Sequence, residues 1–142
     1  VRNFVTLHEN CRLFLHEFWA NYQYKHEFNP PHWHGGLYSF VIWMKIPYSW
    51  EEQIQLPQFQ TTKISDRKAG MFEFEYADTR GETRSLSYQL SPDFEGCMCF
   101  FPAWMRHAVY PFFDTDEERV SISGNVWYDT GTPTTKGKGF GL

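Results

Sequence analysis

Alternation of aromatic and polar side chains in GMFEFEYAD, residues 70–78, is the feature that most limits how this chain can fold. Successive side chains of an extended segment point to opposite faces, so the pattern predicts a β-strand with one apolar face. The aromatic face carries Phe72, Phe74 and Tyr76, and the opposite face carries Met71, Glu73 and Glu75. Gly81 in the next segment, 79–83, predicts a tight turn, after which 84–90 returns as the second strand of a hairpin.

Four other segments are rich in aromatic and β-branched residues and are bounded by Gly or Pro: 12–28, 37–48, 96–102 and 119–129. The first of them is long and contains neither Gly nor Pro. It fits a strand with a bend or bulge better than a helix, because aromatic residues suit a pleated surface. Two sets of its side chains would face opposite ways, namely Phe14, Phe18, Ala20, Tyr22 and Tyr24 against Leu15, Trp19, Asn21 and Gln23.

Strands of this kind with turn residues between them predict an all-β fold, and a double-sheet jelly roll of about eight strands is a common solution. The 142 residues suffice for one domain with its own core, which we expect to span 1–130. Residues 131–142 are rich in Gly, Thr and Lys and predict a flexible tail. Residues 1–11 fit either an edge strand or a helix packed outside the sheets, and 49–69 shows no assignable pattern.

Charge and cysteine content argue against several classes of function. A net charge of −4 without a basic patch disfavours general affinity for nucleic acid. No apolar run reaches the roughly 20 residues that span a bilayer and no secretory signal is evident, so we expect no membrane partner. Three cysteines, two of them one residue apart at Cys97 and Cys99, form a poor disulfide framework, which predicts a reducing, cytoplasmic location.

Two histidines stand close together in NPPHWHGG, residues 29–36. In an extended segment His32 and His34 would share one face, with Trp33 on the other. The flanking Pro and Gly pairs end regular strand pairing, so the histidines would lie at the mouth of a strand. The segment is therefore either a turn that contains imidazoles or, given a third ligand, a metal site. His107, which follows a hydrophobic strand and a proline turn, is the candidate third ligand.

A second polar pattern lies in RVSIS, residues 119–123, where Arg119 and Ser121 share a face that Ser123 and Asn125 continue. An arginine within an apolar strand cannot be buried unpaired without a large cost. If Arg119 is buried, either a carboxylate of the protein or a carboxylate of a ligand is expected to meet its guanidinium. The alternative is a surface arginine that follows the acidic turn DTDEE.

These segments together resemble the 2-oxoglutarate- and Fe(II)-dependent oxygenase family, most closely its short bacterial and phage-type members, whose fold is related to that of the prolyl hydroxylases. The matching segments are 16–48 and 96–128, about half of the chain. The resemblance implies a double-stranded β-helix, the cupin-like form of the jelly roll, with iron between its sheets. It implies that His32 and His107 bind Fe(II), and that Arg119, helped by Ser121, binds the distal carboxylate of the cosubstrate 2-oxoglutarate.

One residue departs from the family pattern. The family has Asp or Glu two residues after the first histidine, whereas this chain has His34. The expected metal ligands are therefore His32, His34 and His107, and with less negative charge at the site Zn or Ni competes better with Fe(II). Glu73 or Glu75 is an alternative source of a carboxylate, although the solvated outer face of their strand is the expected place for both.

Two classes of function stay open at this stage. The first is an oxygenase that hydroxylates a C–H bond of a protein, peptide or small molecule, with a homodimer as a possible assembly. The second is a jelly-roll module that binds a metal or a ligand through three histidines without 2-oxoglutarate, either as a non-catalytic protein or as a cupin-like enzyme. Dependence of turnover on 2-oxoglutarate distinguishes them.

Overall fold

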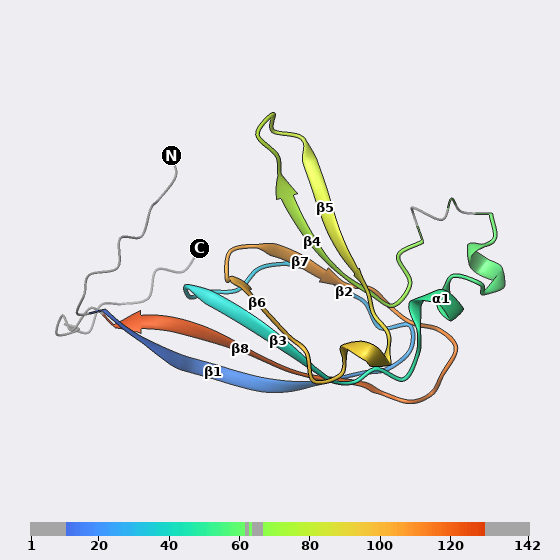
Figure 1. The fold of residues 1–142 in the computed structure, drawn as a ribbon, viewed down its shortest axis with the longest axis horizontal. Helices are drawn as coiled ribbons and strands as arrows, with labels where there is room; N and C mark the ends of the chain where they lie inside the picture. Colours follow the sequence, from blue (N-terminus) through green and yellow to red (C-terminus); the bar gives the residue numbers. More distant parts are fainter. Residues whose placement is uncertain (1–10, 62, 64–66, 130–142) are drawn as a thin grey trace.

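The computed structural model describes residues 11–61, 63 and 67–129, and strands make up most of its regular structure. Eight strands form two antiparallel sheets that face each other as the two layers of a sandwich (Figure 1). This confirms the predicted all-β jelly-roll fold. The strands are β1 Arg12–Gln23, β2 Asn29–His32, β3 Tyr38–Lys45, β4 Met71–Ala77, β5 Thr83–Gln89, β6 Met98–Pro102, β7 Arg106–Val109 and β8 Arg119–Asp129.

The strand order within each sheet determines where a cavity can open. The major sheet has the order β1-β8-β3-β6 and the minor sheet the order β2-β7-β4-β5. The strands β1 and β2 are thus edge strands of different sheets, joined by a short turn. At the other edge of the minor sheet, the β4–β5 hairpin projects away from the major sheet (Figure 1).

The hydrophobic core lies between the sheets and is mainly aromatic. Phe72 and Phe74 of β4 are buried in it, as the alternation in 70–78 predicts, and the Phe74 ring lies 4.8 Å from that of Phe101 on β6. Aromatic pairs at such distances stabilise a core beyond the area they bury. The buried cluster comprises Val41, Trp43, Ile46, Tyr48, Phe72, Phe74, Leu90, Phe101 and Phe112.

The segment 12–28 does not form a single strand. The chain leaves the sheet after Gln23, turns with His26 in the left-handed region (φ 70°), and enters the other sheet as β2. The predicted bulge is present at His16, because Leu15 pairs with Val126 whereas Glu17 pairs with Asn125. One extra residue reverses the alternation, so Leu15 lies on the face of Phe18 and not, as predicted, on that of Trp19.

The segment without an assignable pattern, 49–69, contains a short helix, α1 (Trp50–Gln53), and a 3₁₀ turn (Pro57–Phe59). Ser49 caps α1 by accepting a hydrogen bond from the Glu52 backbone N–H at 3.3 Å. A further 3₁₀ turn, Pro92–Phe94, precedes β6. The expectations for residues 1–10 and for the tail 131–142 lie outside the described residues.

Candidate metal centre

The pairing of β2 with β7 brings together the two histidines that the family resemblance implies as metal ligands. His32 and His107 are direct partners in the antiparallel register of these strands. His34 follows β2, and its backbone N–H donates to the Ala103 carbonyl at 2.9 Å, which ties it to the turn before β7. Gly36 then turns the chain with a φ of +108°, against the Trp127 ring, where a Cβ would lie only 3.0 Å from the indole Nε1.

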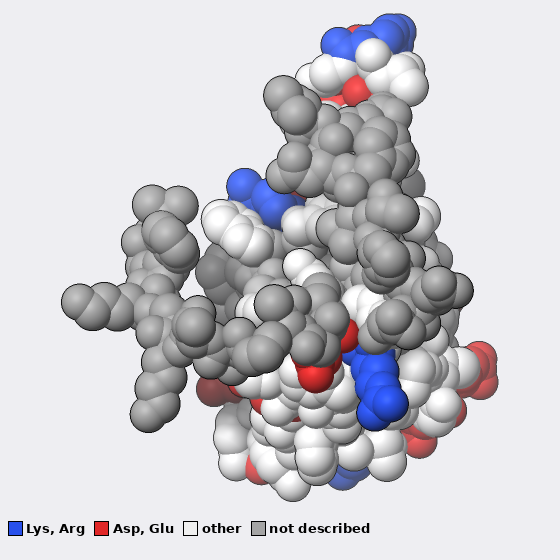
Figure 2. All heavy atoms as spheres, turned by 90° about the vertical axis from the view of Figure 1, so that its left-hand side faces the viewer, with Lys and Arg blue, Asp and Glu red and all other residues white. Residues whose placement is uncertain are grey.

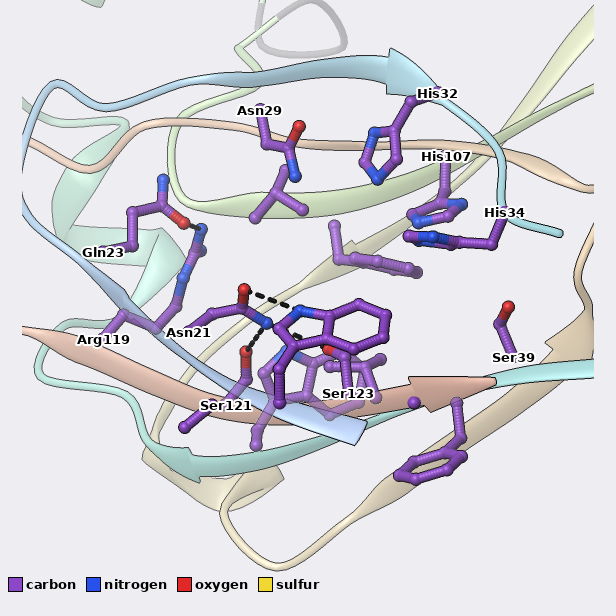
Figure 3. Close-up of a pocket in the computed structure, with 18 of the residues that line it drawn as sticks. Asn21, Gln23, Asn29, His32, His34, Ser39, His107, Arg119, Ser121 and Ser123 are labelled. Atoms are coloured by element: carbon purple, nitrogen blue, oxygen red, sulfur yellow. Dashed lines mark hydrogen bonds between the residues drawn. The ribbon is translucent and has the colours of Figure 1, made fainter. Parts of the chain in front are cut away.

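Figure 3 shows the three imidazoles converging on one point of the space between the sheets. One ligand atom from each of His32, His34 and His107 lies within 4.8 Å of the other two. The Nδ1 of His32 lies 2.7 Å from the Pro30 carbonyl oxygen, and that of His107 lies 3.0 Å from the Met105 carbonyl oxygen. Because a carbonyl only accepts, each Nδ1 carries the proton, which leaves the Nε2 lone pairs for a metal ion.

Burial keeps two of these imidazoles in the neutral form that binds metal. Burial lowers the pKa of His107 to about 4. The hydrogen bond to the Met105 carbonyl acts in the opposite direction, because it favours the protonated ring. Burial also lowers the pKa of His34, and the neighbouring His32 lowers it further. At neutral pH His34 and His107 therefore present unprotonated nitrogen donors, which suit Fe, Zn, Ni and Cu.

The histidines line a cavity of about 620 Å³ between the two sheets (Figure 3). Its polar wall comes from β1 and β8: the Asn21 amide donates to Ser123 Oγ at 3.1 Å and to Ser121 Oγ at 3.4 Å. The Asn21 amide oxygen also accepts from the Trp19 indole at 3.0 Å. This bond orients the indole, whose centroid lies 5.6 Å from that of His34.

Arg119 lines the same cavity, at the end away from the histidines (Figure 3). It is only 3% exposed. Its guanidinium donates to the Tyr48 hydroxyl, to the Gln23 side-chain oxygen and, at 3.4 Å, to the Tyr110 carbonyl. Among residues 11–61, 63 and 67–129, no carboxylate lies within 4.0 Å of it, so all its partners there are neutral.

The two glutamates considered as alternative ligands lie elsewhere. Both face outward from the minor sheet, since Phe72 and Phe74 occupy the inner face of β4. Glu75 lies 3.5 Å from the Arg106 guanidinium. Glu73 is 3% exposed, so its predicted solvated position is wrong. It accepts hydrogen bonds from Lys68, Ser87 and Tyr110, and these bonds hold its pKa below the usual value although burial acts to raise it.

Sequence reasoning gave no role to two residues that position Arg119. Gln23 accepts from the guanidinium, and its own amide donates to the Glu27 carbonyl at 2.6 Å, which fixes the side chain. Tyr48 donates to the Gly70 carbonyl at 2.9 Å and accepts from Arg119. The predicted shared face of Trp19, Asn21 and Gln23 was a usable signal for Gln23. Tyr48 lies three residues beyond the end of β3 at Lys45, and only tertiary packing brings it to Arg119.

An all-β sandwich with a histidine cluster and a buried arginine in one internal cavity defines a jelly-roll protein with a candidate metal site. The model of the family described as "Putative 2OG-Fe(II) oxygenase" matches residues 17–125, well over half of the chain. The chain belongs to this family, which confirms the resemblance seen in the sequence. A search among curated proteins returns no match. Within the described residues, no helix is both long and apolar enough to cross a membrane.

Proposed function

We propose that this protein is a 2-oxoglutarate- and Fe(II)-dependent oxygenase that hydroxylates a C–H bond of its substrate. In this proposal His32, His34 and His107 bind the metal through Nε2. The donor set fits, because three neutral imidazoles suit Fe(II) and leave further coordination positions for the keto acid and O2. Bound there, Fe(II) with 2-oxoglutarate and O2 supplies the oxidation chemistry, and the chain contributes position, charge and exclusion of water.

The observation that carries the proposal is the environment of Arg119. A buried guanidinium with only neutral partners costs several kcal/mol of folding free energy relative to one that meets a carboxylate. Figure 3 places Arg119 facing the cavity that holds the histidines. A ligand with a carboxylate at one end and a metal-binding group at the other would satisfy both ends of this cavity. 2-Oxoglutarate has this arrangement.

The spacing along β8 supports the same ligand. Arg119 and Ser123 are four residues apart, about 13 Å along a strand, and Ser123 pairs with Trp19, whose ring contacts that of His34. The Arg119 side chain faces the cavity, and we infer that this length has room for a short dicarboxylate between its guanidinium and the metal. Ser121 lies between them and accepts from Asn21, so its own hydroxyl proton is free to donate to the ligand.

The cavity also has room for part of a second substrate. Its volume, about 620 Å³, falls within the range of roughly 300–1,000 Å³ typical of small-molecule sites. Trp19 beside His34 and the aromatic rings of Phe72 and Phe101 shield the metal end from water. A dry, shaped environment limits side reactions of the oxidant.

His34 favours a second candidate, a three-histidine site that works without 2-oxoglutarate. Succinate formation from 2-oxoglutarate, measured in air with added Fe(II), tests the choice, with His107→Ala as the metal-site control. Succinate formed by the wild type and lost in the variant supports the oxygenase. A wild type that holds metal but neither binds nor consumes 2-oxoglutarate would establish the second candidate instead.

A further inference from the structure

A row of polar side chains crosses the inner face of the major sheet. Glu17 on β1, Asn125 on β8 and Ser39 on β3 are neighbours in the pairing registers, and Ser39 lies at the His34 end of the cavity (Figure 3). The Ser39 hydroxyl donates to the Asn125 side-chain oxygen at 2.7 Å, and the Asn125 amide donates to Glu17 Oε1 at 2.8 Å. Ser39 and Asn125 are 2% and 3% exposed. A buried amide, itself fixed by a buried hydroxyl, therefore holds one oxygen of the Glu17 carboxylate.

The bulge at His16 turns Glu17 to this inner face. Phe14 pairs with Trp127, which lies on the same face of β8 as Asn125. Regular alternation from Phe14 would bring His16 inward and leave Glu17 outside, whereas the extra residue places Glu17 opposite Asn125. Bulges commonly re-aim a side chain near a functional site. The irregularity in β1 thus gives the inner face a carboxylate.

Contacts on either side of Glu17 place it opposite His34. Trp19, the next inward residue of β1, has its ring 5.6 Å from that of His34. On the other side of Glu17, the next inward residue of β8 is Trp127, and a Cβ on Gly35 would lie 3.3 Å from the Trp127 ring. His34 and Gly35 are consecutive, so Glu17 lies between the two rings that they contact.

The His34 ring differs from the other two imidazoles in its hydrogen bonds. His32 and His107 each have Nδ1 against a backbone carbonyl, whereas the His34 ring makes no hydrogen bond among the residues that the structure describes. Metal-binding histidines usually donate their second ring nitrogen to such a partner, which fixes the ring and raises its basicity. Glu17 acts on the unpartnered ring: burial and His32 lower the pKa of His34, and the Glu17 charge raises it.

We propose that Glu17 is a positioning residue of the metal centre, whose carboxylate accepts from the second ring nitrogen of His34 and orients the ring for the metal. The inference rests on the metal site of the proposed function. Glu17 is not part of the histidine cluster, so it acts through His34 and does not ligate the metal. Only a histidine at position 34 can use it in this way, because an aspartate there would present another acceptor and no proton to donate.

Titration of the metal-free protein with Co(II), followed by the visible absorption of the bound ion, tests the proposal without any turnover. Glu17→Gln removes the charge and keeps a side-chain oxygen that can accept from Asn125. We expect it to bind Co(II) about tenfold more weakly than the wild type, and Glu17→Asp to recover part of the loss. Glu82→Gln is the matched control and should bind as the wild type does. It removes the same charge at the tip of the β4–β5 hairpin, at the top of Figure 2, where Glu82 pairs with two arginines.

A second background, His34→Asp, distinguishes an effect through His34 from a general effect of charge or structure. There the loss caused by Glu17→Gln should shrink or vanish, because two groups that act together are not additive. Equal loss in both backgrounds, or a Glu17→Gln protein that binds Co(II) as tightly as the wild type, would overturn the inference and leave the histidine site in place. A wild type that binds no Co(II) would overturn the inference and the proposed metal site together. Thermal unfolding shows that each variant is folded.

Discussion

Replacement of Arg119 offers the sharpest test of how the cavity binds a keto acid. In the proposed function the guanidinium donates two charge-assisted hydrogen bonds to the distal carboxylate, each contributing about 1.5–3 kcal/mol. Loss of both corresponds to about 3–6 kcal/mol, and 1.4 kcal/mol equals a tenfold change in affinity. We therefore expect Arg119→Ala to weaken 2-oxoglutarate binding by at least two orders of magnitude. Arg119→Lys keeps the charge without the planar fork and should fall between alanine and wild type.

The neighbours of Arg119 determine which variants are informative. Truncation to alanine leaves the Gln23 side-chain oxygen and the Tyr48 hydroxyl without their donor, each at a cost of roughly 1–3 kcal/mol in stability. Arg119→Gln removes the charge but retains a donor that can serve one of them, so it guards against a variant that fails to fold. Arg106→Ala, which removes an exposed arginine paired with Glu75 on the outer side of the minor sheet, is the matched control.

The assay is anaerobic calorimetric titration of 2-oxoglutarate into each protein, with Mn(II) in place of Fe(II) and also without metal. Thermal unfolding of each variant shows whether it is folded at the titration temperature. Folded Arg119 variants that bind 2-oxoglutarate as tightly as the wild type would refute the role of Arg119. Weaker 2-oxoglutarate binding by Arg106→Ala would show that the loss of affinity reflects the overall charge of the protein and not a contact in the cavity.

Three further outcomes follow from the same structure. His107→Ala should lose most of the metal that the wild type holds by elemental analysis, whereas His16→Ala should keep it; equal metal in both would remove His107 from the site. Unfolding of the metal-free protein by urea should be hardest above pH 6.5 and easier as the pH falls toward 4, because burial keeps His107 neutral in the folded state while the unfolded chain takes up a proton first. That pH dependence should shrink in His107→Gln. Glu73→Ala should lower the free energy of unfolding by roughly 2–4 kcal/mol, because it leaves Lys68 and two hydroxyls without their acceptor, whereas Glu75→Ala should change it by less than about 1 kcal/mol. Similar losses in the two variants, measured by urea denaturation, would contradict this reading of Glu73.

Local periodicity predicted most strands, because a sheet with one buried face imposes alternation on its sequence. Phe72 and Phe74 enter the core as their spacing requires. The pattern failed where pairing, not periodicity, determines the structure. The position of the bulge, at His16, is visible only from the register with β8, and β7 has four residues, too few to display a period. The break after Gln23 depends on a contact with a segment that is distant in sequence: the His26 backbone N–H donates to the Phe112 carbonyl at 2.9 Å.

The residues of the candidate site also divide into those that the sequence could indicate and those that only the structure reveals. His32, His34 and Arg119 could be selected from sequence because their polar or charged side chains interrupt apolar or turn-forming segments. Two partners of Arg119 could not be selected in this way, since Tyr48 lies 71 residues away along the chain and Tyr110 contributes only its backbone carbonyl, a group that every residue carries. The same holds for Glu73, which a rule of outward polar residues places in solvent. The structure buries it beneath Lys68 and Tyr110.

This chain has His34 where the family has a carboxylate. The replacement changes where the negative charge of the proposed site must come from. A divalent metal at the histidines and the Arg119 guanidinium place positive charge at both ends of the cavity. Within the described residues no carboxylate belongs to the histidine cluster or lies within 4.0 Å of that guanidinium. The two carboxylates of 2-oxoglutarate would supply the missing charge at both ends. Metal and keto acid should therefore strengthen each other's binding, and by the same factor, because coupling between two sites is reciprocal. The titrations with and without Mn(II) measure this factor, and equal 2-oxoglutarate affinity in both would show that the acid does not contact the metal.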